Sequence, residues 1–237
     1  MKFSEFCLHF GGHMKFSKTA VWGFDHALRG MRNPMDSHHL SDSGYLPEKR
    51  LSVENGVEWV PFRIGEKDMD LAQRLIKSGG EHRKFLRMIH VSVDVDMPRY
   101  WHSEADTYHF NTKNSESTMH KLLNNNNPIT LDDFVICDED TEWWINTVNE
   151  LESMRKEYKK IQKTTKDSVA MTRLLVRAKR MLPEGFLQLR TLDTNYEEVR
   201  NMCFQRGSHR LKEEWVDIFR IWAESLPFAK ELIFYEG

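Results

Sequence analysis

A polar segment at Asp106–His120 contains the residue types best suited to hold a small polar ligand. It reads Asp-Thr-Tyr-His-Phe-Asn-Thr-Lys-Asn-Ser-Glu-Ser-Thr-Met-His and lies between a strand-like run and a loop. Hydroxyl and amide groups at this density need hydrogen-bond partners wherever they are buried. A nucleotide carries many acceptor atoms and would satisfy them, so this segment is the first candidate ligand site.

A pair of adjacent histidines, His38 and His39, suggests a metal site. No further ligands follow at metal-binding spacing, so we expect a surface loop and no metal.

Residues 107–120 resemble the signature of the flavin-dependent thymidylate synthases, R-H-R-x-x-S-x-N-E-x-S-x-R-Y. In an ungapped alignment Asn114 and Ser117 match the signature, and Thr112 conservatively replaces its first Ser. The replaced positions are Thr107, Tyr108 and His109 for Arg-His-Arg, Ser115 for Glu, and Met119 with His120 for Arg-Tyr.

The C-terminal half resembles the same family more closely. The family carries A-R-x-x-L-P, a strand, then the helix N-x-R-x-L-x-x-F-x-x-x-R and A-Q-x-E-I-R. Here Ala178-Lys-Arg-Met-Leu-Pro183 precedes a strand-like run, Asn195 and Arg206 keep the helix spacing, and Glu214 falls at the last Glu. Upstream, His82 and Pro98 match a His and a Pro around the strand that leads to the signature. Three segments in family order cover about residues 80–220.

The resemblance implies roles for individual residues. His82, Asn195 and Asn201 would hydrogen-bond flavin or adenine edges, since an amide both donates and accepts. Arg206 would reach the pyrimidine or its phosphate with a planar fork, as a catalytic and substrate-binding group. The remaining expected site residues are Tyr108 for the cofactor, His109 for catalysis, and Ser117, Lys179, Asn114 and Glu104 for the substrate.

The same resemblance implies the cofactor and partners. These are FAD, with NADPH and methylenetetrahydrofolate as co-substrates, and a pyrimidine nucleotide such as dUMP. Family FAD sites are completed by neighbouring subunits of a homotetramer, so we expect a homo-oligomer. The alternative is that the apolar stripes over residues 142–181 pack only within the chain.

The positions that differ from the signature remove charges that the family reaction uses. Thr107, His109 and Met119 stand where the family has Arg, and each lost oxyanion-type donor costs about 2.7–4 kcal/mol. Lys113, His120 and Lys121 are nearby cations that could compensate. Two hypotheses therefore stand beside the divergent enzyme: a nucleotide- or flavin-binding protein without turnover, and an interaction protein that keeps only the fold.

Several matched residues also have simpler interpretations. Asn195 is equally suited to cap its helix. His82, beside Gly79 and Gly80, could be a loop residue, and Arg206 could form a surface ion pair with Glu213 or Glu214.

Hydrophobic periodicity predicts the elements that must position these residues. Thr130-Leu-Asp-Asp133 predicts a capping box, and Pro61 predicts an edge strand. Helices are predicted over residues 19–32, 68–77, 142–163 and 168–181 and from 194 onward, and strands over residues 57–64, 85–96 and 186–192. Because strands and helices do not alternate regularly, we expect an α+β, thymidylate-synthase-complementing-protein-like fold with a mixed sheet and long helices. Residues 1–18 are interpreted as an N-terminal extension and residues 19–237 as a single domain.

The amino-acid composition argues against nucleic-acid and membrane partners. The hydrophobic fraction of 40% supports a packed core, and the net charge of −2 predicts no nucleic-acid partner. Residues 150–181 carry ten Lys or Arg against four Asp or Glu, either as solvated helix faces or as cations near a phosphate. The acidic run at residues 131–142 is interpreted as a solvated face. No apolar run approaches the roughly 20 residues that span a bilayer, so no membrane partner is expected.

The cysteines predict the compartment. They are widely separated and form no C-x-x-C motif, which is typical of a reducing cytosol, so we expect a cytoplasmic protein without disulfides. The three are Cys7, Cys137 and Cys203.

Overall fold

The computed structural model describes residues 13–47 and 51–236, so most of the predicted N-terminal extension, and with it Cys7, lies outside the described residues. The chain forms two compact units. Within the described residues, the sheet unit comprises residues 16–47, 51–95, 107–114 and 191–236, and the helical unit comprises residues 13–15, 96–106 and 115–190.

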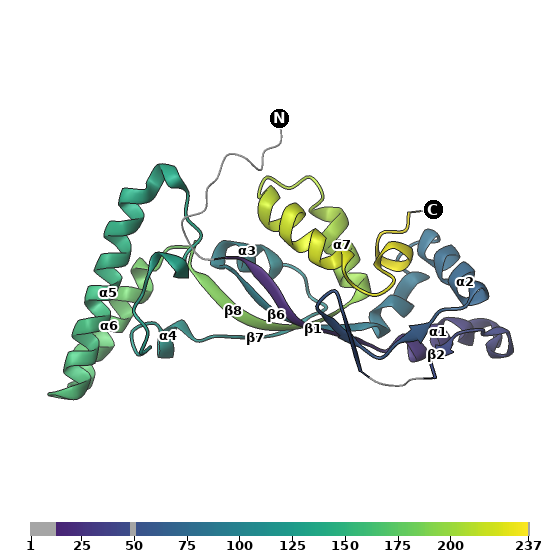
Figure 1. Ribbon diagram of the computed structural model, residues 1–237, viewed down its shortest axis with the longest axis horizontal. Coiled ribbons are helices and arrows are strands. Elements are labelled where there is room, and N and C mark those ends of the chain that lie inside the picture. The colour runs from purple at the N-terminus through teal and green to yellow at the C-terminus, as the bar shows by residue number, and fades with distance from the viewer. Residues whose placement is uncertain (1–12, 48–50, 237) are drawn as a thin grey trace. The chain divides into compact units, whose positions relative to one another are not determined.

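A six-stranded mixed sheet with the order β3-β4-β1-β6-β8-β7 underlies the sheet unit (Figure 1). β1 pairs in parallel with β4, and β3 pairs antiparallel with β4. β6 and β8 contribute residues to both units. The strands are β1 (Lys15–Trp22), β3 (Ser52–Glu54), β4 (Val57–Trp59), β6 (His90–Pro98), β7 (Thr112–Ser115) and β8 (Leu187–Asn195), and β2 (Gly44–Tyr45) pairs separately with β5 (Phe62–Arg63).

Helices complete the sheet unit around an aromatic core. The ring of Phe24 lies 5.8 Å from that of Tyr196 and 5.4 Å from that of Phe228. The helices of this unit are α1 (Phe24–Arg32), α2 (Glu66–Lys77), α7 (Tyr196–Gln205) and α8 (Ile221–Glu224), with the 3₁₀ segments η2 (Asn33–Met35), η3 (His38–Leu40) and η4 (Arg83–Met88) and the π-helical segments η7 (Glu213–Arg220) and η8 (Ala229–Ile233).

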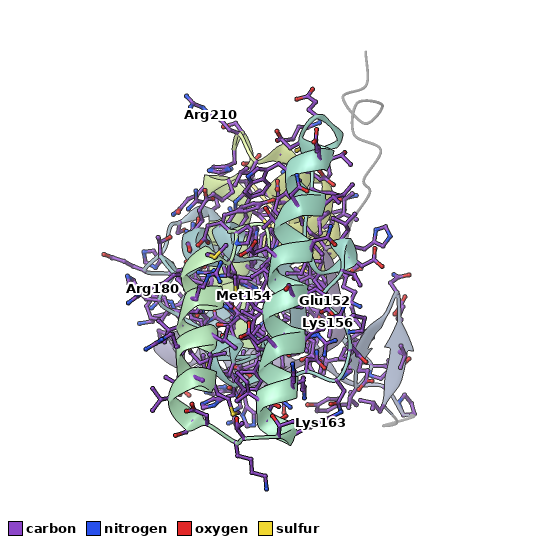
Figure 2. All side chains as sticks on the ribbon, turned by 90° about the vertical axis from the view of Figure 1, so that its left-hand side faces the viewer. Glu152, Met154, Lys156, Lys163, Arg180 and Arg210 are labelled. Atoms are coloured by element: carbon purple, nitrogen blue, oxygen red, sulfur yellow. The ribbon has the colours of Figure 1, made fainter. Side chains whose placement is uncertain are left out.

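The helical unit is built on a long hairpin of α5 (Thr141–Lys163) and α6 (Ser168–Met181), which lie side by side (Figure 1, Figure 2). Trp144, Val148, Leu151 and Met154 recur at spacings of three and four and bury one face of α5. They pack with Leu174 and Ala178 and with residues from the preceding loop. The unit also contains α3 (Arg99–Ala105), α4 (Thr118–Lys121) and the 3₁₀ segments η5 (Leu131–Asp133) and η6 (Asp138–Asp140).

Most predicted elements are confirmed. These are the helices over residues 68–77, 142–163 and 168–181, the strand that begins near residue 186, the start of the helix that follows Asn195, and the capping box at Thr130. The helix predicted from residue 194 onward ends at Gln205, and separate helical segments follow it from Glu213. The predicted α+β fold class with a mixed sheet and long helices is confirmed as well.

Three predictions need correction. The helix expected over residues 19–32 begins only at Phe24, because residues 19–22 belong to β1 and Gly23 turns the chain at a φ of 97°. The strand expected over residues 85–96 begins only at His90, because residues 83–88 form η4 with Phe85 and Leu86 buried. The strand expected over residues 57–64 is interrupted around Pro61, which lacks the N–H that a continuous ladder needs.

Candidate functional site

In the first half of the polar segment, Phe110 is hydrogen-bonded to residues at the N-terminus of α7. The backbone N–H of Phe110 donates to Glu198 Oε1 at 3.1 Å. The Phe110 carbonyl accepts from Thr194 Oγ1 at 3.2 Å and from Asn195 Nδ2 at 3.4 Å. These three contacts hold residues near position 110 against the helix that the resemblance associates with flavin binding.

Asn195 is the N-cap of α7. Its Oδ1 accepts from the N–H of Glu198 at 3.0 Å, which satisfies one of the free donors of the first helical turn. Its amide nitrogen is used on Phe110, and the side chain is buried. The capping interpretation is therefore confirmed, and a ligand contact for Asn195 stays a prediction.

Glu198 links the predicted residues Asn195 and Asn201. Its carboxylate accepts from Phe110 and, at 3.5 Å, from Asn201 Nδ2, and only 4% of the residue is exposed. Glu198 was not among the site residues predicted from the sequence. An Asn followed three positions later by Glu is a capping-box pattern and could have indicated it.

Arg206 and Tyr108, 98 positions apart in the sequence, are in direct contact. Arg206 Nε donates to the Tyr108 hydroxyl at 3.1 Å. The guanidinium carbon lies 5.0 Å from the centre of the Trp215 ring and 5.7 Å from that of Tyr108. Cation–π contacts and a fixed hydrogen bond together set the orientation of the guanidinium plane. Trp215, which was not among the site residues predicted from the sequence, is a further member of this cluster.

His82 lies immediately before η4 and is exposed. Its side chain forms no hydrogen bond to any residue that the structure describes. Arg83, next in the chain, donates through Nε to both carboxylate oxygens of Glu197 on α7 at 3.0 Å each. The loop interpretation of His82 agrees with these contacts, and its imidazole is available for a ligand.

The exposed end of the segment presents an aromatic surface. His109 and Phe110 are exposed, and the Arg87 guanidinium lies 4.5 Å above the Phe110 ring. Asn111 Nδ2 donates to the Tyr108 carbonyl at 2.8 Å, but the buried Oδ1 of Asn111 has no partner among the described residues. A buried acceptor without a partner is costly, and a ligand N–H would satisfy it.

A second group of predicted residues belongs to the helical unit. Ser117 caps α4 by accepting from the His120 N–H at 3.2 Å, and Lys179 Nζ donates to the Thr118 hydroxyl. Burial, followed by the nearby Arg99 guanidinium, lowers the pKa of Lys179. Two close cations of which one is partly desolvated favour an anion beside them.

The other two predicted substrate residues are more peripheral. Glu104 is half-buried near the end of α3, and Asn114 is exposed on β7. The side chain of Asn114 forms no hydrogen bond within the described residues. The structure thus groups Tyr108 with Arg206, Asn195 with Asn201, and Ser117 with Lys179.

The helical unit also contains a cavity of about 320 Å³ next to Ser117. Burial and the neighbouring Asp133 raise the pKa of Asp96, and burial raises that of Asp133. The lining residues of the cavity are Asp96, Glu116, Ser117, Thr118, Lys121, Leu122, Asn125, Asn127, Pro128, Ile129, Asp132, Asp133, Phe186, Leu187 and Leu189.

Residues 13–47 and 51–236 contain neither a metal-ligand cluster nor a membrane-spanning helix. No three or more His, Cys, Asp or Glu side chains gather there as metal ligands. Of the helices in the same residues, none combines the length and the apolar character needed to cross a bilayer.

Comparison with known proteins gives a match in structure alone. No protein-family model and no curated protein sequence matches the chain. The flavin-dependent thymidylate synthase ThyX from Helicobacter pylori, crystallised with FAD and dUMP, aligns with 94% of this chain and 98% of its own, with a TM-score of 0.65 and 17% identity. A second structure of ThyX from that organism with FAD and dUMP covers 93% and 97%, with a TM-score of 0.64 and 17% identity. The chain therefore has the thymidylate-synthase-complementing-protein-like fold.

Proposed function

We propose that the protein is a divergent FAD-dependent enzyme of the thymidylate synthase type. It transfers a one-carbon unit from a folate, methylenetetrahydrofolate, to a pyrimidine deoxynucleotide, converting dUMP to dTMP or carrying out a related reaction. The contact between Arg206 and Tyr108 carries the proposal, because it joins two family positions that are far apart in the sequence. Fold similarity over 94% of the chain to an enzyme crystallised with FAD and dUMP supports it.

The described residues fit a flavin. Asn111 Oδ1 is a buried acceptor without a partner, and the exposed His82 imidazole can donate or accept. Asn201 makes one long contact, of 3.5 Å, so its amide retains hydrogen-bonding capacity. His82, Asn201, Tyr108 and Asn111 would hold the isoalloxazine or adenine edge, whereas Asn195 mainly supports them by capping α7.

The nucleotide phosphate is assigned to Lys179, Ser117 and Arg99. The depressed pKa of Lys179 reflects burial and repulsion from Arg99, and attraction to a bound anion would offset both effects. Arg99 Nη2 lies 3.0 Å from Glu184 Oε1, so part of its charge is already compensated. Lys179 is therefore the main phosphate ligand in this proposal.

Arg206 supplies the fixed positive charge that the reaction requires. Negative charge develops on the pyrimidine as it is activated, and a preorganised cation stabilises that charge. Tyr108 and Trp215 orient the guanidinium beforehand, which avoids reorganisation during the reaction. His109, exposed on the same segment as Tyr108, is the second residue proposed for catalysis.

When bound, FAD supplies the redox chemistry, with NADPH as the reductant and methylenetetrahydrofolate as the one-carbon donor. The task of the protein is to position the reactants and stabilise charge, since no residue acts as a nucleophile. We further propose a cytoplasmic homotetramer in which residues 19–237 act as one domain.

Absorbance of the purified protein between about 350 and 500 nm tests the flavin proposal. A yellow protein, or one that gains this absorbance when FAD is added, is expected. Colourless protein that also takes up no added FAD would contradict it. Thermal unfolding with dUMP provides an independent readout, because a ligand that binds only the folded state raises the unfolding temperature.

A binding protein without turnover is the second candidate. Met119 is exposed where the family places an Arg, and Thr107 supplies no charge at another such position. Complementation of a thymidylate auxotroph separates the two functions, because only the enzyme restores growth.

A further inference from the structure

The α5–α6 hairpin concentrates the positive charge of the protein. Residues 150–181 hold ten Lys or Arg and four Asp or Glu, a net charge of +6, although the whole chain carries −2. The rest of the chain is therefore net acidic. Charge separated in this way produces a local field that attracts an oppositely charged partner.

The cations form one stripe on each helix of the hairpin. Residues at i, i+4 and i+7 share a helix face and span about 10 Å at 1.5 Å per residue. In Figure 2, Lys156 and Lys163 project from α5 and Arg180 from α6. The stripe on α5 consists of Lys156, Lys160 and Lys163, and that on α6 consists of Arg173, Arg177 and Arg180.

Four of these six side chains lack a compensating charge. Lys156 lies 3.9 Å from Glu152, and Arg177 Nη2 lies 2.5 Å from Glu150 Oε1. Within the described residues, the other four are exposed and form no ion pair, namely Lys160, Lys163, Arg173 and Arg180. Exposed cations that form no ion pair remain available to attract an external anion.

Open grooves run beside both stripes. A groove of about 640 Å³ follows α5 and is lined by Lys156, Lys160 and Lys163 together with Asn126. Lys159 Nζ donates to the Asn124 carbonyl at 2.6 Å, which holds the loop of four asparagines at residues 124–127 against this groove. A second groove, of about 600 Å³, follows α6 and contains the three arginines of its stripe.

The length of the stripes favours an extended polyanion over a single phosphate, which one or two cations would satisfy. A protein partner normally buries an apolar centre in its interface. The groove along α5 offers no such centre, because all the residues that line it are polar or charged, whereas Val169, Val176 and Met181 line part of the groove along α6. Neither groove is lined by an aromatic side chain on which a base could stack. We infer that the outer face of the hairpin binds the phosphodiester backbone of a nucleic acid without reading its bases. The sequence predicted no nucleic-acid partner because the net charge of the whole chain is near zero. That net value conceals the local positive charge of the hairpin.

Fluorescence anisotropy with a labelled oligothymidylate tests this inference on the full chain. The hairpin variant carries Lys160→Gln, Lys163→Gln, Arg173→Gln and Arg180→Gln. Log affinity for a single strand falls with log salt at a slope of about −0.7 per neutralised phosphate, so four lost contacts should flatten the slope by about 3. At about 0.1 M salt the same loss weakens binding by several hundred-fold.

The matched control removes equal charge from the sheet unit. It carries Lys67→Gln, Lys77→Gln, Lys84→Gln and Lys230→Gln, all at exposed positions. Circular dichroism checks that both variants fold. The inference is supported if the control binds like the parent and the hairpin variant does not.

Three outcomes would overturn it: a parent protein that does not bind at about 50 mM salt, equal losses in both variants, or polyglutamate binding the hairpin as tightly as the oligonucleotide. The last outcome would assign the surface to acidic polypeptides. None of these readouts depends on FAD or dUMP, so the proposed enzyme can fail or succeed independently.

Discussion

Arg206 is the one arginine of the family pattern that this chain retains at a proposed nucleotide-binding position. Its guanidinium is oriented by the Tyr108 hydroxyl and the Trp215 ring, so its loss removes a preorganised charge. Charge-assisted hydrogen bonds contribute about 1.5–3 kcal/mol. We expect Arg206→Ala to weaken dUMP binding by roughly 10- to 100-fold, measured by calorimetry, with a smaller effect on FAD.

Lys at position 206 should restore only part of the affinity, because it lacks the planar fork. Arg210→Ala is the matched control, since Arg210 is exposed four residues further on. If Arg206→Ala and Arg210→Ala bind dUMP alike, the pyrimidine lies elsewhere.

Two aspartates of β6 should respond to pH with opposite sign. Burial and Asp133 raise the pKa of Asp96, so its folded state holds the proton more tightly than the unfolded chain. The contribution of Asp96 to folding stability is therefore fully present at pH values below its ordinary pKa of 3.8. It is lost as the pH rises through the raised pKa of the folded state. Asp96→Asn should therefore raise the unfolding temperature at pH 7, with a gain that disappears toward pH 4.

Asp94 provides the opposite control on the same strand. A hydrogen bond from Thr191 at 2.7 Å, helped by Lys18, lowers its pKa, so its contribution is present at neutral pH and is lost under acid. Asp94→Asn should lower the unfolding temperature at pH 7. Equal shifts in both variants would mean that the two carboxylates lie in similar environments in solution.

At the scale of elements, Gly23 decides where β1 ends and α1 begins. It has a φ of 97°, and a Cβ built on it would lie 2.2 Å from the Met88 carbonyl oxygen. Because backbone atoms cannot move aside cheaply, Gly23→Ala should destabilise the fold by at least roughly 1–3 kcal/mol in urea unfolding. Gly44→Ala is the control, since nothing lies within 4 Å of its added Cβ. A stability for Gly23→Ala that equals the parent would mean that this junction is loose.

At the scale of the whole molecule, the oligomeric state is tested by light scattering. The proposed homotetramer should scatter with four times the 28.2 kDa mass of the chain. The expected result is a tetramer whose mass does not change on dilution across the micromolar range. A 28.2 kDa monomer would contradict the tetramer and would weaken the proposal of a flavin site completed by neighbouring subunits.

The sequence by itself determined the elements whose signals are local. The apolar residues from Trp144 to Met154 recur at helical spacing, and α5 follows that pattern. Asn195 shows its capping role by its type and by its place before a helical run. The order of the family-like segments was likewise sufficient to predict the fold class that the solved structures share.

Tertiary structure decided everything that depends on pairing across long separations. Residues Thr19–Trp22 have helix-compatible spacing, yet they form a strand because β4 supplies the parallel partner, with Thr19 opposite Val57. Two clusters form only when α7 packs against the polar segment. One joins Glu198 to Phe110 and Asn201, and the other joins Arg206 to Tyr108 and Trp215. Local propensity acts over a few residues, whereas strand pairing and side-chain clusters are stabilised by neighbours that only the folded chain brings together.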